Sequence, residues 1–186
     1  MEGRLGLNPD GPMAPVPQNA LEVAGFVLAH AAWSVSDTAD DGVLCPLIMV
    51  ERDGGRRLMR FEATTQCDAV ARGKKAMADL TESADAWEFA REGAAGSDAP
   101  ADGPPPGPSL TLEFWAKGMD TPLAIVQHFE RPSRAGRFVV RGAPGVLVDG
   151  SHADEELAAE VHRGVMAGVR THPKVADLWR EWQEEG

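Results

Sequence analysis

The chain has 186 residues, of which 43% are hydrophobic and 25% charged, the composition of a folded soluble protein. Its 29 acidic residues outnumber 18 basic ones, and the net charge of −11 disfavours general nucleic-acid binding because an acidic surface repels phosphate. Two cysteines are too few for a disulfide scaffold, and no apolar run is long enough to cross a bilayer. We therefore expect a cytoplasmic protein without a membrane contact.

The N-terminal residues 1–17 predict a flexible arm, because proline and glycine recur there and block regular structure. A helix is predicted from Gln18 to about Val35, where apolar residues recur at helical spacing. Phe26 and Trp33 lie off that apolar stripe. A helix with this pattern is typically covered on more than one side.

A hairpin and a second helix follow. The run Val43–Val50 is almost continuously apolar, which predicts a strand buried on both faces. Asp53–Arg56 has the composition of a hairpin turn, and Arg57–Ala63 returns as a second strand. Thr65 is expected to cap a helix that runs to about Leu80.

Strands dominate the next part of the chain. The residues Ala86–Glu92 alternate in polarity and predict a third strand. The stretch Gly93–Ser109 is rich in proline and glycine, so it cannot pack a core and is predicted to be a mobile surface insertion. Two further strands are predicted at Leu110–Lys117 and Leu123–Glu130.

The C-terminal part returns to helices. Two short strands are predicted at Arg137–Arg141 and Val146–Val148. Ser151 is the expected N-cap of a helix that ends near Arg170, and a short helix is expected after Pro173.

These elements predict the fold class. Strands do not alternate regularly with helices, which argues against a doubly wound parallel sheet. We expect residues 18–186 to form a single α+β domain with a mostly antiparallel sheet of about five or six strands, helices packed on one face, and the insertion at 93–109.

Positive charge is gathered in two segments of this acidic chain. Residues 52–75 carry seven Arg or Lys against three acids, and residues 131–148 carry four Arg and no acid. Arginine grips carboxylate or phosphate with two parallel hydrogen bonds, so a shared cationic face would suit an acidic partner or a phosphate. The candidate residues are Arg52, Arg56, Arg57, Arg60, Arg137 and Arg141. The alternative is that they are solvated side chains paired with nearby acids.

A second candidate site lies on the hairpin of the two long strands. If Lys117 pairs with Ala124, then Glu113 faces His128, and Trp115 lies on the same side of the sheet. A Glu–His pair beside a tryptophan could act as a general acid and base or as a shelf for a ligand. The alternative is an ordinary cross-strand polar pair.

Cys67 is the third candidate. It lies in the first turn of a predicted helix, where the helix dipole favours the nucleophilic thiolate. A catalytic thiol also needs a base, and no histidine is near it in the sequence. His152, His162 and His172 are ten residues apart and would point to different sides of a helix, so no metal site is expected. The nucleotide-binding and hydrolase motifs are absent, and no cofactor is expected.

The sequence therefore favours a non-catalytic protein-interaction module that uses a local basic surface. Trp179 and Trp182 on the last helix are expected to dock onto an unknown partner or a second copy, since tryptophan and arginine often anchor interfaces. The alternative function is a small-molecule or enzymatic site, either on the sheet face or with Cys67 as the nucleophile.

Overall fold

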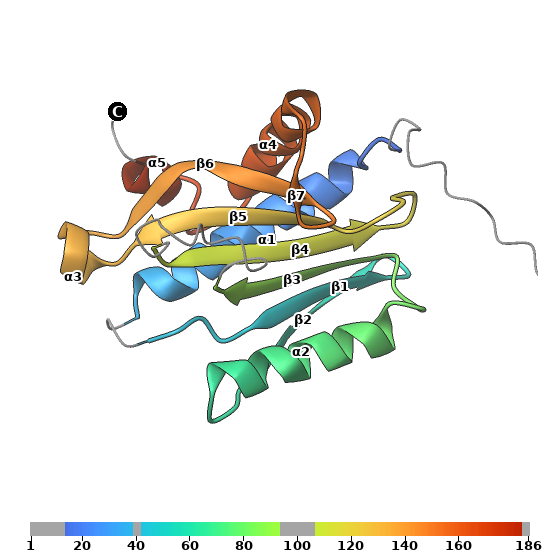
Figure 1. Cartoon of the computed structure of the whole chain (residues 1–186), viewed down its shortest axis with the longest axis horizontal. Helices are drawn as coiled ribbons and strands as arrows, with labels where there is room; N and C mark the ends of the chain where they lie inside the picture. The colour runs from blue at the N-terminus through green and yellow to red at the C-terminus, as the bar shows by residue number, and fades with distance from the viewer. Residues whose placement is uncertain (1–13, 39–41, 94–106, 184–186) are drawn as a thin grey trace, which may run out of the picture.

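The structure, a computed structural model, describes residues 14–38, 42–93 and 107–183 (Figure 1). Most of the predicted N-terminal arm and of the insertion at 93–109 lies outside the described residues. Among the helices of the described ranges, none is both long and apolar enough to cross a membrane.

Seven strands form one antiparallel sheet in the order β2-β1-β3-β4-β5-β6-β7. The strands are β1 (Leu47–Arg52), β2 (Gly55–Arg60), β3 (Ala86–Glu92), β4 (Ser109–Ala116), β5 (Leu123–Glu130), β6 (Val139–Val148) and β7 (Ser151–His152). Most neighbours in the sheet are also neighbours in the chain, as expected for a meander of hairpins. The predicted α+β class with an antiparallel sheet is confirmed.

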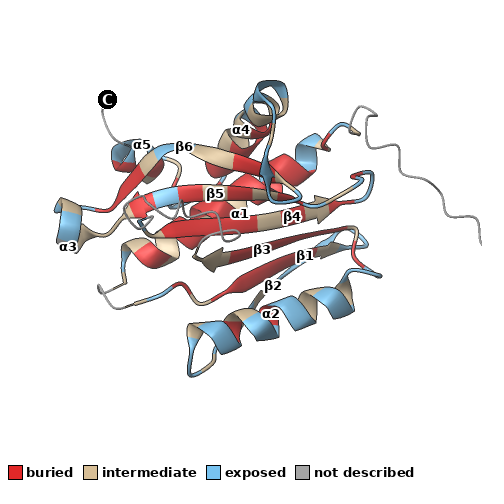
Figure 2. Cartoon of the chain, in the orientation of Figure 1, coloured by how far each residue is buried: buried red, intermediate tan, exposed pale blue. Residues whose placement is uncertain are grey.

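Helices lie on both faces of this sheet (Figure 1). They are α1 (Gln18–Ser36), α2 (Gln66–Leu80), α3 (Pro132–Ala135), α4 (Glu155–Val169) and α5 (Leu178–Trp182). The main core lies between the sheet and α1, α4 and α5, while a smaller core lies between α2 and the strands β1 and β3. Figure 2 shows the resulting contrast between the buried strands and the exposed outer side of α2.

The prediction that helices pack on one face differs from the structure at α2. Side chains alternate along β1, so Leu47 and Met49 enter the main core and Ile48 and Val50 pack under α2. The apolar run in β1 therefore needs cover on both faces, and α2 supplies the second.

The number of strands also exceeds the five or six expected, because of the turn after β6. Asp149 and Gly150 adopt positive φ angles of 48° and 80°, which make a two-residue hairpin turn. Ser151 consequently pairs with Val148 in β7 and does not cap the next helix. That cap is Asp154, whose Oδ1 accepts a hydrogen bond from the Leu157 N–H (2.9 Å).

The helices α1 and α4 pack with their backbones in contact. A Cβ added at Gly25 would lie 2.0 Å from the carbonyl oxygen of Val165, and one added at Gly168 would lie 1.9 Å from that of Glu22. Only glycine allows this approach. The close packing of α4 explains why α1 is apolar on more than one side.

The helix α2 covers only part of its face of the sheet. It contacts β1 and β3, and the described residues place no helix over β4, β5 and β6 on that face (Figure 1). Thr65 caps α2 as predicted, since its Oγ1 accepts a hydrogen bond from the Asp68 N–H (3.1 Å). The uncovered half of the sheet therefore begins beside α2 and ends at the turn between β6 and β7.

Candidate functional site

The two basic segments do not form one surface. Residues 52–60 lie at the β2 edge of the sheet, whereas Arg137 lies just before β6 and Arg141 lies within it. Four strands separate β2 from β6, a distance of about 24 Å at the usual strand spacing. The predicted common cationic face is therefore absent from this fold.

Even within β2 the arginines diverge. Arg57 pairs with Val50, which packs under α2, whereas Arg60 pairs with Leu47, which lies in the main core. Because directly paired residues point to the same face, Arg57 and Arg60 point to opposite faces of the sheet.

Four of the six candidate arginines contact an oxygen close by. The contacts are Arg52 with Asp53 (3.4 Å), Arg56 with Glu51, Arg141 with Glu130 (2.8 Å), and Arg137 with the backbone oxygen of Glu181 (2.7 Å). Arg57 and Arg60 have no carboxylate partner among the described residues. Most of the six candidate arginines are therefore solvated side chains that pair with a nearby group.

The predicted Glu–His pair is also not formed. In the hairpin of β4 and β5, Glu113 pairs with Ala124, while His128 pairs with Ser109. Glu113 and His128 are therefore about 13 Å apart along the sheet, although they share its α2 face with Trp115.

The loop before β5 explains the change of register. Trp115 Nε1 donates a hydrogen bond to the backbone oxygen of Met119 (3.0 Å), and Met119 Sδ accepts one from the Ala116 N–H (3.3 Å). The loop thus folds back onto the end of β4, and the pairing of the two strands ends at Phe114 and Leu123.

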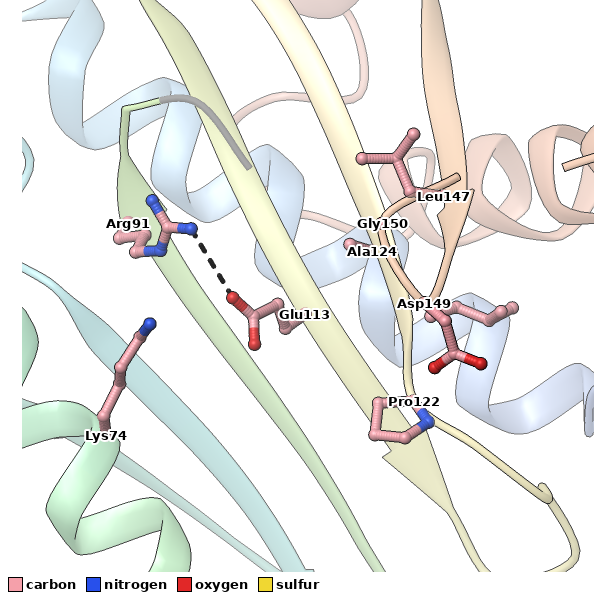
Figure 3. A pocket seen from close by; sticks show the side chains of 9 residues that line it. Lys74, Arg91, Glu113, Pro122, Ala124, Leu147, Asp149 and Gly150 are labelled. Atoms are coloured by element: carbon pink, nitrogen blue, oxygen red, sulfur yellow. Dashed lines mark ion pairs between the residues drawn. The ribbon is translucent and has the colours of Figure 1, made fainter. Parts of the chain in front are cut away.

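Glu113 lines a groove of about 310 Å³ on the uncovered half of the sheet (Figure 3). The groove is lined by Lys74, Arg91, Glu113, Pro122, Leu123, Ala124, Leu147, Asp149 and Gly150. Figure 3 shows Lys74 on the side of α2, Asp149 on the side of the β6–β7 turn, and Arg91 and Glu113 between them.

The groove carries charges of both signs. On its floor, Arg91 Nη2 lies 3.5 Å from Glu113 Oε1, and both side chains are mostly buried. Lys74 and Asp149 are exposed and form no ion pair in the described part of the chain. The charges of Lys74 and Asp149 thus lie on either side of a floor where Arg91 and Glu113 pair with each other.

Local sequence places both flanking charges. Lys74 follows Gly73, where an added Cβ would lie 2.7 Å from Cε2 of Phe89, so glycine lets α2 approach β3 closely. Asp149 occupies the first position of the two-residue turn with positive φ, a conformation that aspartate tolerates. The sequence places Lys74 in a basic segment but does not bring it together with Arg91 and Asp149, because the three residues come from distant segments.

A second cluster gathers two histidines with cationic side chains. His30 Nδ1 of α1 lies 3.3 Å from His172 Nε2, and Arg60 Nη2 lies 2.8 Å from His30 Nε2. The Lys174 ammonium lies 4.6 Å from the ring centroid of Trp33. Burial lowers the pKa of His30 most, followed by the charges of Arg60 and His172. Burial also lowers the pKa of His172, and Lys174 adds to that effect.

The tryptophans of α5 do not provide the predicted docking surface. Trp179 and Trp182 are buried in the main core, and the Trp182 ring lies 4.9 Å from that of Phe138 in an edge-on contact. These side chains therefore anchor α5 to the chain's own sheet.

Cys67 is exposed in the first turn of α2, and the hydrogen bonds of the histidine rings among the described residues do not include it. The general base that a nucleophilic thiol needs is thus not beside it. The described residues also contain no group of three or more His, Cys, Asp or Glu arranged to hold a metal ion. No protein-family model, curated protein or solved structure matches the chain with significance.

Proposed function

We propose that this protein is a non-catalytic binding module and that the groove over Glu113 takes a small zwitterionic ligand. One observation carries the proposal: Lys74 and Asp149, which form no ion pair with the described residues, flank the groove on opposite sides. A ligand carboxylate would lie near Lys74, and a ligand ammonium group would lie near Asp149. The Arg91–Glu113 pair would supply a further donor and acceptor on the floor.

The dimensions of the groove favour a compact ligand. Its volume of about 310 Å³ is at the lower end of the range for small-molecule sites. Ala124 and Leu147 give the floor apolar surface for a short aliphatic chain. A dipeptide has this size and both terminal charges.

The lining supports binding over catalysis. It contains no serine, cysteine or histidine, so a nucleophile with an adjacent base is missing from this set of residues. Cys67 does not belong to the lining, and the sheet-face histidine His128 does not either.

The test is a titration with alanyl-alanine followed by amide NMR. We expect shifts confined to the groove, with at least tenfold weaker binding for the N-acetylated or C-amidated dipeptide. Lys74→Ala should weaken binding to a similar extent, while Lys75→Ala on the same helix should not. Asp149→Asn keeps a residue that tolerates the turn and removes only the charge.

Absence of saturable shifts with alanyl-alanine would contradict the proposal, as would equal binding by the two lysine variants. Unchanged binding of either capped dipeptide would show that the groove does not recognise the corresponding terminal charge, and would also reject a zwitterionic ligand.

A second candidate function retains the protein-interaction role and places it at β2. This strand is an outer strand of the sheet, Arg57 has no carboxylate partner in the described ranges, and Leu58 is 39% exposed. An acidic extended segment could add to this edge by backbone pairing. Its binding should weaken steeply with salt, and binding that is indifferent to salt would reject it. A cytoplasmic location and self-association stay predictions.

A further inference from the structure

Hydrogen bonds link three parts of the chain in a row from Arg60 to Lys174, which we call the histidine row. Arg60 Nη2 meets His30 Nε2 at 2.8 Å, and His30 Nδ1 meets His172 Nε2 at 3.3 Å. The backbone N–H of Lys174 donates to His172 Nδ1 (3.3 Å). The row thus joins β2, α1 and the segment after α4, and it has a hydrogen-bond donor at each end.

Two neutral imidazoles cannot satisfy both of these end donors. A neutral imidazole has one N–H and one bare nitrogen that accepts. The contact between His30 and His172 uses one donor and one acceptor, which leaves a single acceptor for the two ends. In every combination of neutral tautomers, one end therefore sets an N–H against another N–H. Protonation of either ring adds a further donor and increases the mismatch.

The outer end of the row is the place where a ligand can relieve this mismatch. His172 is buried, whereas Arg60 is exposed and His30 is half-buried. With a hydrogen on His30 Nε2, the His172 Nε2–H donates to His30 Nδ1, and His172 Nδ1 accepts from Lys174. Every inner position is then satisfied, and Arg60 and His30 present adjacent N–H groups that need an acceptor atom.

We propose that Arg60 and His30 bind an oxyanion of the phosphate class at the outer end of the histidine row. Phosphate oxygens accept the charge-assisted hydrogen bonds that arginine and imidazole donate. The Lys174 ammonium adds positive charge, since it lies over Trp33, whose ring is 5.8 Å from that of His30. No carboxylate of the described residues forms an ion pair with Arg60 or Lys174.

Proton uptake is not expected to accompany this binding. Burial lowers the pKa of both rings and keeps them neutral, and the nearby charges add to that effect: Arg60 from β2 beside His30, and Lys174 from the segment after α4 beside His172. Neutral His30 already presents the Nε2–H that the anion needs, and a further proton on either ring would set an N–H against an inner donor. Binding of an anion of constant charge should therefore change little as the pH falls from about 8 to 6.

The experiment follows the histidine side-chain NMR signals during titration with inorganic phosphate, and with acetate as the carboxylate comparison. The matched variants are Arg60→Gln and Arg57→Gln, since both arginines lie on β2 and point to opposite faces. We expect saturable shifts of His30 and His172, at least tenfold weaker binding in Arg60→Gln, and no change in Arg57→Gln. Sulfate, which keeps its charge over this range, serves for the pH comparison.

Four results would overturn the proposal. The first is the absence of saturable shifts with phosphate, and the second is an equal loss in the two arginine variants, which would indicate general charge attraction. The third is sulfate binding that tightens steeply as the pH falls, which would mean that an imidazolium ring binds the anion. Tighter binding of acetate than of phosphate would reject the phosphate class and assign the site to carboxylates.

Discussion

Gly168 of α4 lies against the backbone of Glu22 in α1, so closely that a Cβ on Gly168 would stand 1.9 Å from the Glu22 carbonyl oxygen. The contact fixes the distance between the two helices. It also sets the histidine row, because His30 belongs to α1 and His172 follows α4 by only a few residues. The glycine contact between α1 and α4 thus determines how His30 and His172 lie relative to each other.

Replacement of Gly168 by alanine should destabilise the fold by about 3 kcal/mol or more, because a backbone atom cannot yield to the added methyl group. Urea denaturation measures this loss. Gly107→Ala is the matched control, since an added Cβ there meets no atom within 4 Å, and it should change stability by less than about 0.5 kcal/mol. Similar losses in both variants would refute the tight contact.

Glu88 is a buried acid on the main-core side of β3. It is 0% exposed, pairs with Met49 and Phe114 in the neighbouring strands, and both its carboxyl oxygens lack a hydrogen-bond partner among the described residues. Burial raises the pKa of Glu88 well above 4.5, and the nearby Glu51 carboxylate raises it further. A buried acid without a partner is expected to cost stability.

Glu88→Met should therefore stabilise the protein at neutral pH by about 1–3 kcal/mol. In the wild type, the folded state keeps the Glu88 proton above pH 4.5 while the unfolded state loses it, so this group's contribution to stability falls as the pH rises. The Glu88→Met variant has no titrating group at this position. Its free energy of unfolding should therefore exceed that of the wild type by a larger margin as the pH rises. Urea denaturation at several pH values measures this, and a constant or shrinking difference would contradict it.

Much of the local structure could be predicted from the sequence, because periodicity and capping are local signals. The ends of β3 and β5 match the alternating segments, and Thr65 caps α2 as its spacing indicates. At Ser151 two local signals compete. Ser151 resembles an N-cap, but the Asp149–Gly150 turn recruits it into β7.

The candidate sites were harder to predict because they depend on register and strand order. A shift of four residues in the β4–β5 pairing separates Glu113 from His128, and that shift comes from the way Met119 folds back onto Trp115. Strand order likewise places Arg60 and Arg141 far apart, although both belong to clear basic segments. Neither property follows from local sequence pattern.

The histidine pair should make stability depend on pH in the acidic direction. Since the pKa of both His30 and His172 is lowered in the folded state, the unfolded state binds protons more readily below about pH 6.5. Their contribution to stability is therefore present above that pH and is lost as the pH falls. His172→Phe, which keeps a ring against Phe26, should flatten this loss in urea denaturation. His152→Gln on the exposed β7 is the control, and an equal flattening there would contradict the assignment.

Arg131 should be the arginine on which the fold depends most. Its Nη2 donates to both carboxylate oxygens of Glu92 (2.9 Å each) and to the Gly42 backbone oxygen (2.7 Å), and its guanidinium lies 5.1 Å from the Phe129 ring centroid. Both charged side chains are only 12% exposed, so removing one partner leaves the other charge largely buried. Arg131→Ala should therefore cost about 3–5 kcal/mol.

Urea denaturation of Arg131→Ala, Glu92→Ala and the double variant tests this pair. The double variant should lose clearly less stability than the sum of the single variants, because each single change leaves a buried charge that the second removes. Arg134→Ala, on the exposed side of the adjacent short helix α3, should change stability by less than about 0.5 kcal/mol. Additive losses would mean that the Arg131–Glu92 contact contributes nothing beyond the two side chains taken separately.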